Sequence, residues 1–197
     1  MNTQRTILQR RKTGAEVLRG TGVRNGPTIL EFWQWGFSDL LTNTMRSVLA
    51  EFIVANALGI RDGLRDPWLE YDLITDDGIK IEVKSSAYVQ SWPQDKPSSI
   101  SFSIAKARRW AFRPTRLVGD LKRHADVYVF CLLAHTDRKT IDPLKFDQWE
   151  FFVLKKYLIN KKLGDQKSLS LRKLLKLNPA KTSYVDLSST VRTCMNK

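Results

Sequence analysis

Two acidic residues and one lysine are spaced so that they can act together on a substrate or a metal ion. Asp72 precedes the turn Asp76-Asp77-Gly78, and Glu82 and Lys84 follow it. A three-residue hairpin loop that ends in a left-handed glycine suits this turn and places Asp72 directly opposite Glu82. Because side chains alternate along a strand, Asp72, Glu82 and Lys84 then share one face. A two-residue loop, Asp77-Gly78, would shift the pairing by one position and misplace Asp72.

The opposed carboxylates predict a site for a hard cation. Two carboxylates directly across a strand pair repel each other, and such pairs are normally unfavourable. Mg²⁺, or Mn²⁺ in its place, would turn that repulsion into a binding site. Lys84 lies two residues further along the same face, where its ammonium group can orient a water molecule. A solvated hairpin face that carries Lys80, Glu82 and Lys84 is the alternative interpretation.

The residues around the hairpin predict one α/β domain. Ser38 or Asp39 can cap a helix that runs to about Leu58, and Gly59 supplies its end. Strands are expected at residues 70–75, 79–84, 126–134 and 149–154, with a short strand at 99–104 and basic helical stretches at 155–163 and 169–177. The stretch 126–134 is apolar and β-branched at its start, which is typical of a central buried strand.

This arrangement resembles the PD-(D/E)xK nuclease superfamily of restriction-endonuclease-like folds, which includes some Holliday-junction resolvases. The matching residues are Asp72 and, after a short hairpin, Glu82-Val83-Lys84; Tyr71 stands where the family signature has proline. The resemblance extends over about residues 39–133, in the order helix, hairpin, helix or loop, and buried strand. It implies an α/β fold with a mixed central β-sheet flanked by helices.

The resemblance also implies roles for individual residues. Asp72 and Glu82 would bind Mg²⁺, the backbone carbonyl of Val83 would be a further ligand, and Lys84 would help to activate water. Family members often add a glutamate from the preceding helix, and Glu51 fits that position. A carboxylate beside an apolar stripe needs a partner, which a metal ion or Lys84 would provide. Many relatives act as homodimers, which suits the cutting of both strands.

The charge distribution favours a polyanionic partner, and DNA above all. The net charge is +13; residues 1–30 carry six Lys/Arg against one acid, and residues 155–197 carry eleven against two. Two basic ends therefore flank a near-neutral middle, a pattern that favours nucleic acid, with an anionic membrane surface as the alternative. Residues 1–27 are expected to form a basic, flexible N-terminal arm, and residues 28–197 a nuclease-like domain with a basic C-terminal helical region.

Side chains that follow the hairpin are further candidates for contact with nucleic acid. They combine basic groups, which can neutralise phosphates, with polar groups and an aromatic ring on which a base can stack. The candidates are Ser85, Ser86, Gln90, Trp92, Lys106, Arg108, Arg109 and Arg113. A charged, solvated face is the alternative interpretation of the arginines.

The number of cysteines and the length of the apolar runs indicate the cellular compartment. Cys131 and Cys194 are the only cysteines, which is a poor disulfide framework and suggests a reducing compartment. The N-terminus lacks the apolar run of a signal peptide, and the longest apolar run, residues 127–134, is too short to span a bilayer. We therefore expect a cytoplasmic protein without a membrane partner.

Taken together, the sequence predicts a Mg²⁺-dependent DNA endonuclease of a restriction, defence or repair type. Two alternatives remain open. One is a nucleic-acid-binding protein without catalysis, in which Asp72 and Glu82 are surface charges. The other is a structure-specific resolvase that prefers DNA junctions.

Overall fold

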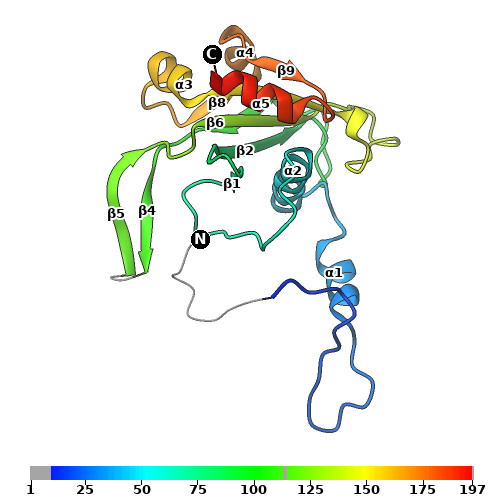
Figure 1. Cartoon of the computed structure of the whole chain (residues 1–197). Coiled ribbons are helices and arrows are strands. Elements are labelled where there is room, and N and C mark those ends of the chain that lie inside the picture. Colours follow the sequence, from blue (N-terminus) through cyan, green and yellow to red (C-terminus); the bar gives the residue numbers. More distant parts are fainter. Residues whose placement is uncertain (1–9, 113–114, 197) are drawn as a thin grey trace.

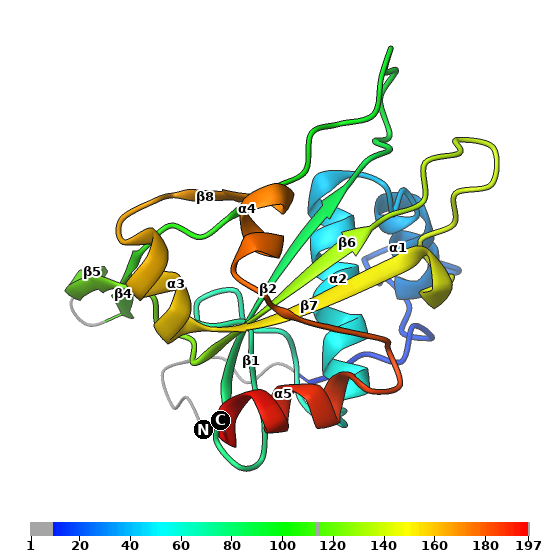
Figure 2. The same ribbon diagram turned by 90° about the horizontal axis from the view of Figure 1, so that it is seen from above.

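A five-stranded mixed sheet is the centre of the structure, a computed structural model that describes residues 10–112 and 115–196 (Figures 1 and 2). The strands follow the order β1-β2-β6-β7-β9. Their bounds are β1 Leu73–Ile74, β2 Lys80–Ala87, β6 Val127–Leu133, β7 Trp149–Lys155 and β9 Ala180–Thr182. β2 and β6 run parallel, and the other neighbours are antiparallel. The predicted mixed central sheet is therefore confirmed.

Strand β6 is the buried middle of the sheet, as its apolar sequence predicts. All seven of its residues are buried. Because side chains alternate, Val129 and Cys131 contribute to one core and Phe130 and Leu132 to the other. A strand that is apolar on both faces can be accommodated only where both faces are covered.

Helices cover both faces of the sheet. On the face that carries Ile81 and Val83 lie α2 (Asn43–Ala57) and α5 (Leu187–Asn196). On the other face lie α3 (Lys156–Leu163), α4 (Leu171–Lys176) and a small sheet of β3 (Ser101–Ser103) and β8 (Ser168–Ser170). The two predicted C-terminal helices correspond to α3 and α4, whereas α5 and β9 were not predicted. Among the described residues, no helix has the length and apolarity needed to cross a bilayer.

Helix α2 begins later than the sequence predicts. Thr42, rather than Ser38 or Asp39, is the N-cap, and its hydroxyl accepts a hydrogen bond from the Met45 N–H. Asp39 caps only the turn before the helix, where its carboxylate accepts from a backbone N–H. Gly59 follows the helix with a φ of +77°, the left-handed conformation expected of it.

Residues 107–112 and 115–122 are strands that pair as a β-ribbon, which corrects the helix or loop expected between the hairpin and the buried strand. β4 (Ala107–Phe112) pairs antiparallel with β5 (Thr115–Lys122), and the pair projects from the body of the molecule (Figure 1). The register shifts between Ala107 and Arg109. Such an irregularity interrupts the two-residue alternation by which a strand is recognised in a sequence. We call the two strands, residues 107–112 and 115–122, the β4–β5 ribbon.

Residues 10–37, which we call the N-terminal arm, extend away from the sheet (Figure 1). Val17 pairs with Thr28 in an isolated antiparallel bridge. Helix α1 (Ile29–Phe37) then begins with a capping box, in which the Thr28 hydroxyl accepts from the Glu31 N–H and the Glu31 carboxylate accepts from the Thr28 N–H. This helix was not predicted, although Thr-x-x-Glu before an apolar run is its usual signature. Residues 1–9 of the predicted flexible arm lie outside the described residues.

Candidate active site

The β1–β2 hairpin has the register that a three-residue loop predicts. Ile74 pairs with Lys80 across the turn. Gly78, the last loop residue, has a φ of +86°, a conformation that a residue with a side chain rarely adopts. Continued by two residues, this register places Asp72 opposite Glu82. The alternative two-residue loop is excluded.

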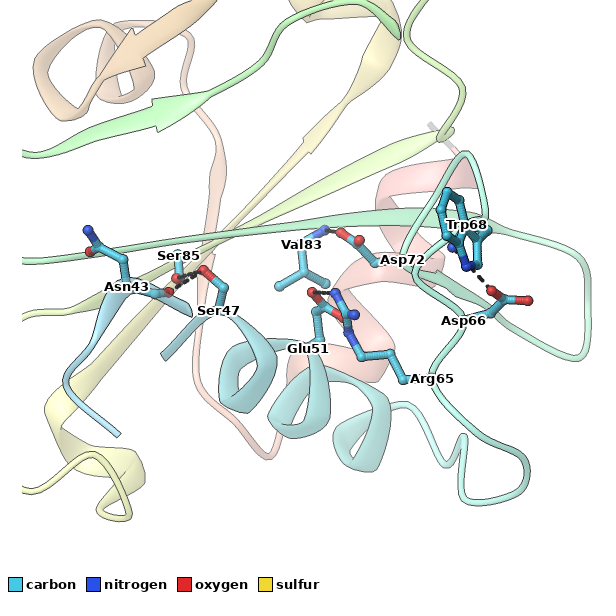
Figure 3. Close-up of polar contacts among 9 residues, drawn as sticks. All are labelled: Asn43, Ser47, Glu51, Arg65, Asp66, Trp68, Asp72, Val83 and Ser85. Atoms are coloured by element: carbon cyan, nitrogen blue, oxygen red, sulfur yellow. Dashed lines mark hydrogen bonds and ion pairs between the residues drawn. The ribbon is translucent and has the colours of Figure 1, made fainter. Parts of the chain in front are cut away.

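The Asp72 carboxylate lies at the edge of strand β2. Its Oδ2 accepts a hydrogen bond from the backbone N–H of Val83 at 2.7 Å (Figure 3). Main-chain N–H and C=O groups lie in the plane of a sheet, so the carboxylate occupies the sheet edge rather than standing on the face it was expected to share with Glu82 and Lys84. The carbonyl of Val83 points to the same edge, because the N–H and C=O of one strand residue point the same way.

Asp72 carries an uncompensated negative charge in a poorly solvated place. Burial and the nearby negative charge of Glu82 raise the pKa of Asp72 to about 7. Glu51 contributes in the same direction, while Lys84 and the hydrogen bond from Val83 oppose the rise. Charged residues of α2 and β2 therefore all act on the Asp72 carboxylate, and a cation bound to it would relieve the repulsion from the neighbouring acids.

Lys84 and Glu82 form an ion pair on strand β2. The Lys84 Nζ lies 2.6 Å from Glu82 Oε1, and their side chains are 27% and 19% exposed. Burial lowers the pKa of Lys84, but the carboxylates of Glu82 and Asp72 outweigh that effect and raise it above the ordinary value. Lys84 is therefore held as an ammonium ion, which can donate hydrogen bonds but cannot accept a proton near neutral pH.

Glu51 is paired with Arg65, a residue that the sequence reasoning missed. The guanidinium Nε and one terminal nitrogen of Arg65 lie 2.5 Å and 2.8 Å from the two Glu51 oxygens (Figure 3). Such a fork-to-fork pair fixes both side chains. The partner expected for this buried carboxylate was a metal ion or Lys84. No motif marks Arg65 in the sequence, because its place depends on the path of the loop after α2.

A cleft of about 620 Å³ opens between α2, the loop after it and β1. The side chains of Asp72, Glu51 and Arg65 contribute its polar groups near the hairpin. Much of the remaining wall is apolar, contributed by Val48, Phe52, Ala55, Ile60, Leu64, Leu69, Leu73 and Ile74. Glu82 and Lys84 do not line this cleft, so the acidic cluster is reached by way of Asp72 and Glu51.

Two of the polar residues predicted to touch nucleic acid have hydrogen-bond partners within the chain. The Gln90 amide oxygen accepts from Arg46 at 3.0 Å, and its nitrogen donates to a backbone carbonyl. Ser85 is hydrogen-bonded to Ser47 of α2 at 3.1 Å. Ser86 and Gln90 are buried, so neither side chain is presented to solvent.

The basic candidates are better placed for a phosphate. Arg108 is exposed on the β4–β5 ribbon, and Arg109 is exposed beside it and makes a long 3.7 Å ion pair with Glu70. Lys106 contacts Asp165 at 2.5 Å. Exposed pairs of this kind contribute little stability, so a phosphate can replace the carboxylate at small cost.

The remaining two candidates for contact with nucleic acid are Trp92 and Arg113. Trp92 is 47% exposed and can therefore be reached from solvent. Arg113 lies outside the described residues.

The carboxylates and the main-chain carbonyl near Asp72 are the groups available to bind a hard cation. Within residues 10–112 and 115–196, no three carboxylate, imidazole or thiol side chains stand close enough together to form a ready-made metal site. The reason is visible in the two ion pairs, since Glu51 faces Arg65 and Glu82 faces Lys84. The chemistry of the donors nevertheless fits, because the Asp72 carboxylate and the Val83 carbonyl at the sheet edge and the Glu82 carboxylate on the adjoining face of β2 are oxygen donors of the kind that a hard cation prefers.

The fold and the site define an α/β protein in which a mixed sheet presents a cluster of coupled acidic and basic groups at the mouth of a cleft, an arrangement suited to an enzyme. A comparison with known protein families matches residues 33–173 to the family described as bacteriophage T4 endonuclease IV. The match covers more than half of the chain, so the protein belongs to this family and is a nuclease. The matched range contains all of the clustered residues described above. The comparison with individual curated proteins gives no match.

Proposed function

We propose that the protein is a Mg²⁺-dependent DNA endonuclease with a PD-(D/E)xK-type active site formed by Asp72, Glu82 and Lys84. The observation that carries the proposal is the position of the Asp72 carboxylate. It lies at the edge of β2 with the Glu82–Lys84 ion pair and the Glu51–Arg65 ion pair in its electrostatic reach. A buried carboxylate with a raised pKa beside other acids is typical of a functional site.

Asp72, Glu82 and the carbonyl of Val83 would hold the divalent cation, with Glu51 as a further or water-mediated ligand. When bound, the ion would polarise the scissile phosphate and make a water molecule more nucleophilic at neutral pH. Its charge would also relieve the repulsion that raises the pKa of Asp72. Mn²⁺ is expected to substitute, because it accepts the same oxygen donors.

The side chains then have separate tasks. Lys84, kept protonated by its two acidic neighbours, donates a hydrogen bond that orients the attacking water or a phosphate oxygen. As negative charge develops on the phosphate oxygens, the ammonium group stabilises it without having to move. Arg65, whose side chain is 45% exposed at the cleft, is the second cation available to the phosphate.

Nucleic acid is the polyanion that the remaining charge fits. The chain has a net charge of +13, and Arg108 and Arg109 project from the β4–β5 ribbon on the part of the molecule that extends beyond the sheet. Each phosphate that such a side chain neutralises releases a counterion, so affinity for DNA should fall steeply with salt.

The test is cleavage of supercoiled plasmid DNA with Mg²⁺ or Mn²⁺, with and without a chelator. Asp72→Asn, Glu82→Gln and Lys84→Met should each lower the rate about a hundredfold or more, because each removes a group that acts on the transition state. The matched control is Glu150–Lys181, an ion pair of 2.5 Å on β7 and β9 of the same sheet. Glu150→Gln and Lys181→Met should cleave at the wild-type rate.

Binding and cleavage assays with these proteins distinguish the proposed endonuclease from a non-catalytic binding protein, and a restriction-type enzyme from a resolvase. Equal DNA binding by wild-type and Asp72→Asn protein, without cleavage by either under any metal condition, would indicate a binding protein without catalysis. Discrete fragments from linear duplex DNA indicate a restriction-type enzyme. Preference for a four-way junction over a duplex of the same sequence indicates a resolvase.

A further inference from the structure

Helix α1 presents an apolar surface that nothing in the described chain covers. None of its nine residues is buried, although most are aromatic or aliphatic. Trp35 is 86% exposed, and Leu30, Phe32, Trp33 and Phe37 are 38–50% exposed. Each exposed large aromatic ring keeps a substantial area in contact with water, and the resulting patch reaches the size that usually marks an interaction surface.

Helix α1 also has little of the packing against other elements that a short helix needs to remain folded. Helices shorter than about 12 residues are marginal in water, and packing of an apolar face normally stabilises them. In the described chain α1 has its capping box and a contact at its base, where Trp33 and Leu30 close over the turn at Gly14. That contact uses one side of the helix and leaves Trp35 outside it.

A second apolar surface without a cover lies on the body of the same chain. A groove of about 250 Å³ runs between α2 and the loop before β7. Leu144 is 66% and Phe52 is 58% exposed at its rim, and its far wall is the stacked pair Phe146 and Tyr184, whose ring centroids are 3.9 Å apart. Helix α1 does not line this groove, and the N-terminal arm points away from the sheet (Figure 1).

We propose that the N-terminal arm is a dimerisation arm, whose helix α1 docks by its Trp35 face into the α2–Phe146 groove of a second copy of the chain. Both surfaces are apolar, and each lacks a partner in the single chain. In a two-fold dimer the exchange is reciprocal, so that both arms and both grooves are covered at once. The pairing is independent of the chemistry proposed for Asp72, Glu82 and Lys84.

The area agrees with the need of a stable dimer. Trp35 and Phe32 share one side of the helix, and at about 150–250 Å² for a whole aromatic side chain their exposed parts amount to roughly 300 Å² per arm. Two arms and the two surfaces they cover would bury about 1,200 Å² in total, at the lower end of the range of specific interfaces of about 1,200–2,000 Å². One arm alone would fall short of that range.

The first measurement is the mass in solution, by light scattering behind a sizing column over a range of micromolar concentrations. The wild type should give twice the monomer mass of 22.7 kDa. Trp35→Ser and Leu144→Asp should each raise the dissociation constant at least about a hundredfold, because every dimer loses the contact twice. The control is Tyr157→Ser on α3, an exposed aromatic residue (60%) outside both surfaces, which should remain a dimer.

Mixing the two variants distinguishes arm-in-groove pairing from arm-to-arm pairing. A Trp35→Ser chain keeps an intact groove and a Leu144→Asp chain keeps an intact arm, so a mixture restores one of the two contacts and should form mixed dimers more tightly than either variant alone. A wild-type protein that is monomeric throughout, or variants that dimerise like the wild type, would overturn the proposal. A mixture that behaves like its separate components would also overturn it. A Leu144→Asp chain that dimerises like the wild type, while Trp35→Ser does not, would overturn it in favour of contact between the two arms.

Discussion

Replacing Asp72 by asparagine should stabilise the protein at the cost of its activity. The asparagine oxygen can still accept the 2.7 Å hydrogen bond from Val83, while the charge is lost. A rise of the Asp72 pKa from about 4 in the unfolded chain to about 7 in the folded one corresponds to a cost of about 4 kcal/mol for the ionised side chain. The amide nitrogen of asparagine needs a new partner among the nearby carboxylates, so we expect a net gain of about 1–3 kcal/mol in the free energy of unfolding.

The stability of Asp72→Asn relative to the wild type should increase as the pH rises. A carboxyl whose pKa is raised in the folded state holds its proton more tightly there than in the unfolded chain. The free energy of unfolding of the wild type therefore falls as the pH rises from about 4 to about 7, and the full cost remains above pH 7. The Asp72→Asn variant has no such slope, so near pH 4 it should be less stable than the wild type by the cost of its amide group, about 1–3 kcal/mol, whereas above pH 7 it should be the more stable of the two.

Thermal unfolding without divalent metal, measured from pH 4 to pH 8, tests this reasoning. At pH 8 the variant should melt about 2–12 °C higher than the wild type, given about 2–4 °C per kcal/mol for a domain of this size. Asp77→Asn is the matched control of opposite sign, since hydrogen bonds to Thr75 and the positive charge of Arg192 lower the pKa of Asp77. That variant should lose stability above the ordinary carboxyl range. An Asp72→Asn protein that is no more stable than the wild type at pH 8, or a difference that does not vary with pH, would refute the assignment of an uncompensated charge to Asp72.

Two further predictions concern Lys84 and the β4–β5 ribbon. Lys84→Arg should recover part of the cleavage that Lys84→Met loses, because a fixed positive charge near the phosphate is the requirement; single-turnover rates at saturating DNA test this, and full activity of Lys84→Met would contradict it. Arg108→Ala should weaken DNA binding at all sequences and lower the slope of log affinity against log salt by about 1, as measured by fluorescence anisotropy, with Lys139→Ala of the loop before β7 as the control. An unchanged slope would place the DNA elsewhere.

The site hairpin and the central strand could be predicted because their signals are local. The turn that ends at Gly78 fixes the register of β1 and β2, and a one-residue change would be incompatible with the burial of Ile81 and Val83. The run at residues 127–133 is apolar on both faces, and only a central strand of a covered sheet buries both faces.

Features that depend on distant partners could not be predicted in the same way. Arg65 reaches Glu51 only because the loop after α2 folds back along that helix, and no spacing rule encodes that path. The side chain of Gln90 is of a type that often contacts DNA, but here it is buried and hydrogen-bonded to Arg46, which lies 44 positions away in the sequence. The β4–β5 ribbon was hidden by its register shift. The α1 helix, in contrast, had a readable capping box at Thr28 that was overlooked.

The two ion pairs around Asp72 predict that the divalent cation proposed for this site and DNA would bind cooperatively. Glu51 and Glu82 are each neutralised by a cation of the chain, so a divalent ion that recruits either carboxylate releases Arg65 or Lys84 from its partner. A released cation in this cleft is unfavourable until a phosphate takes the place of the carboxylate. Each ligand therefore removes the cost that the other would meet, and by linkage the effect is reciprocal.

We expect Ca²⁺, which fills such sites with little turnover, to tighten DNA binding by roughly tenfold or more, within the usual range of coupling free energies. Arg65→Ala should reduce this coupling and raise the affinity for the metal alone, because Glu51 is then free before the metal arrives. Calorimetry of the metal with and without a DNA duplex measures both quantities. Identical metal affinities in the two titrations would show that the ion pairs are structural and are not exchanged for ligands.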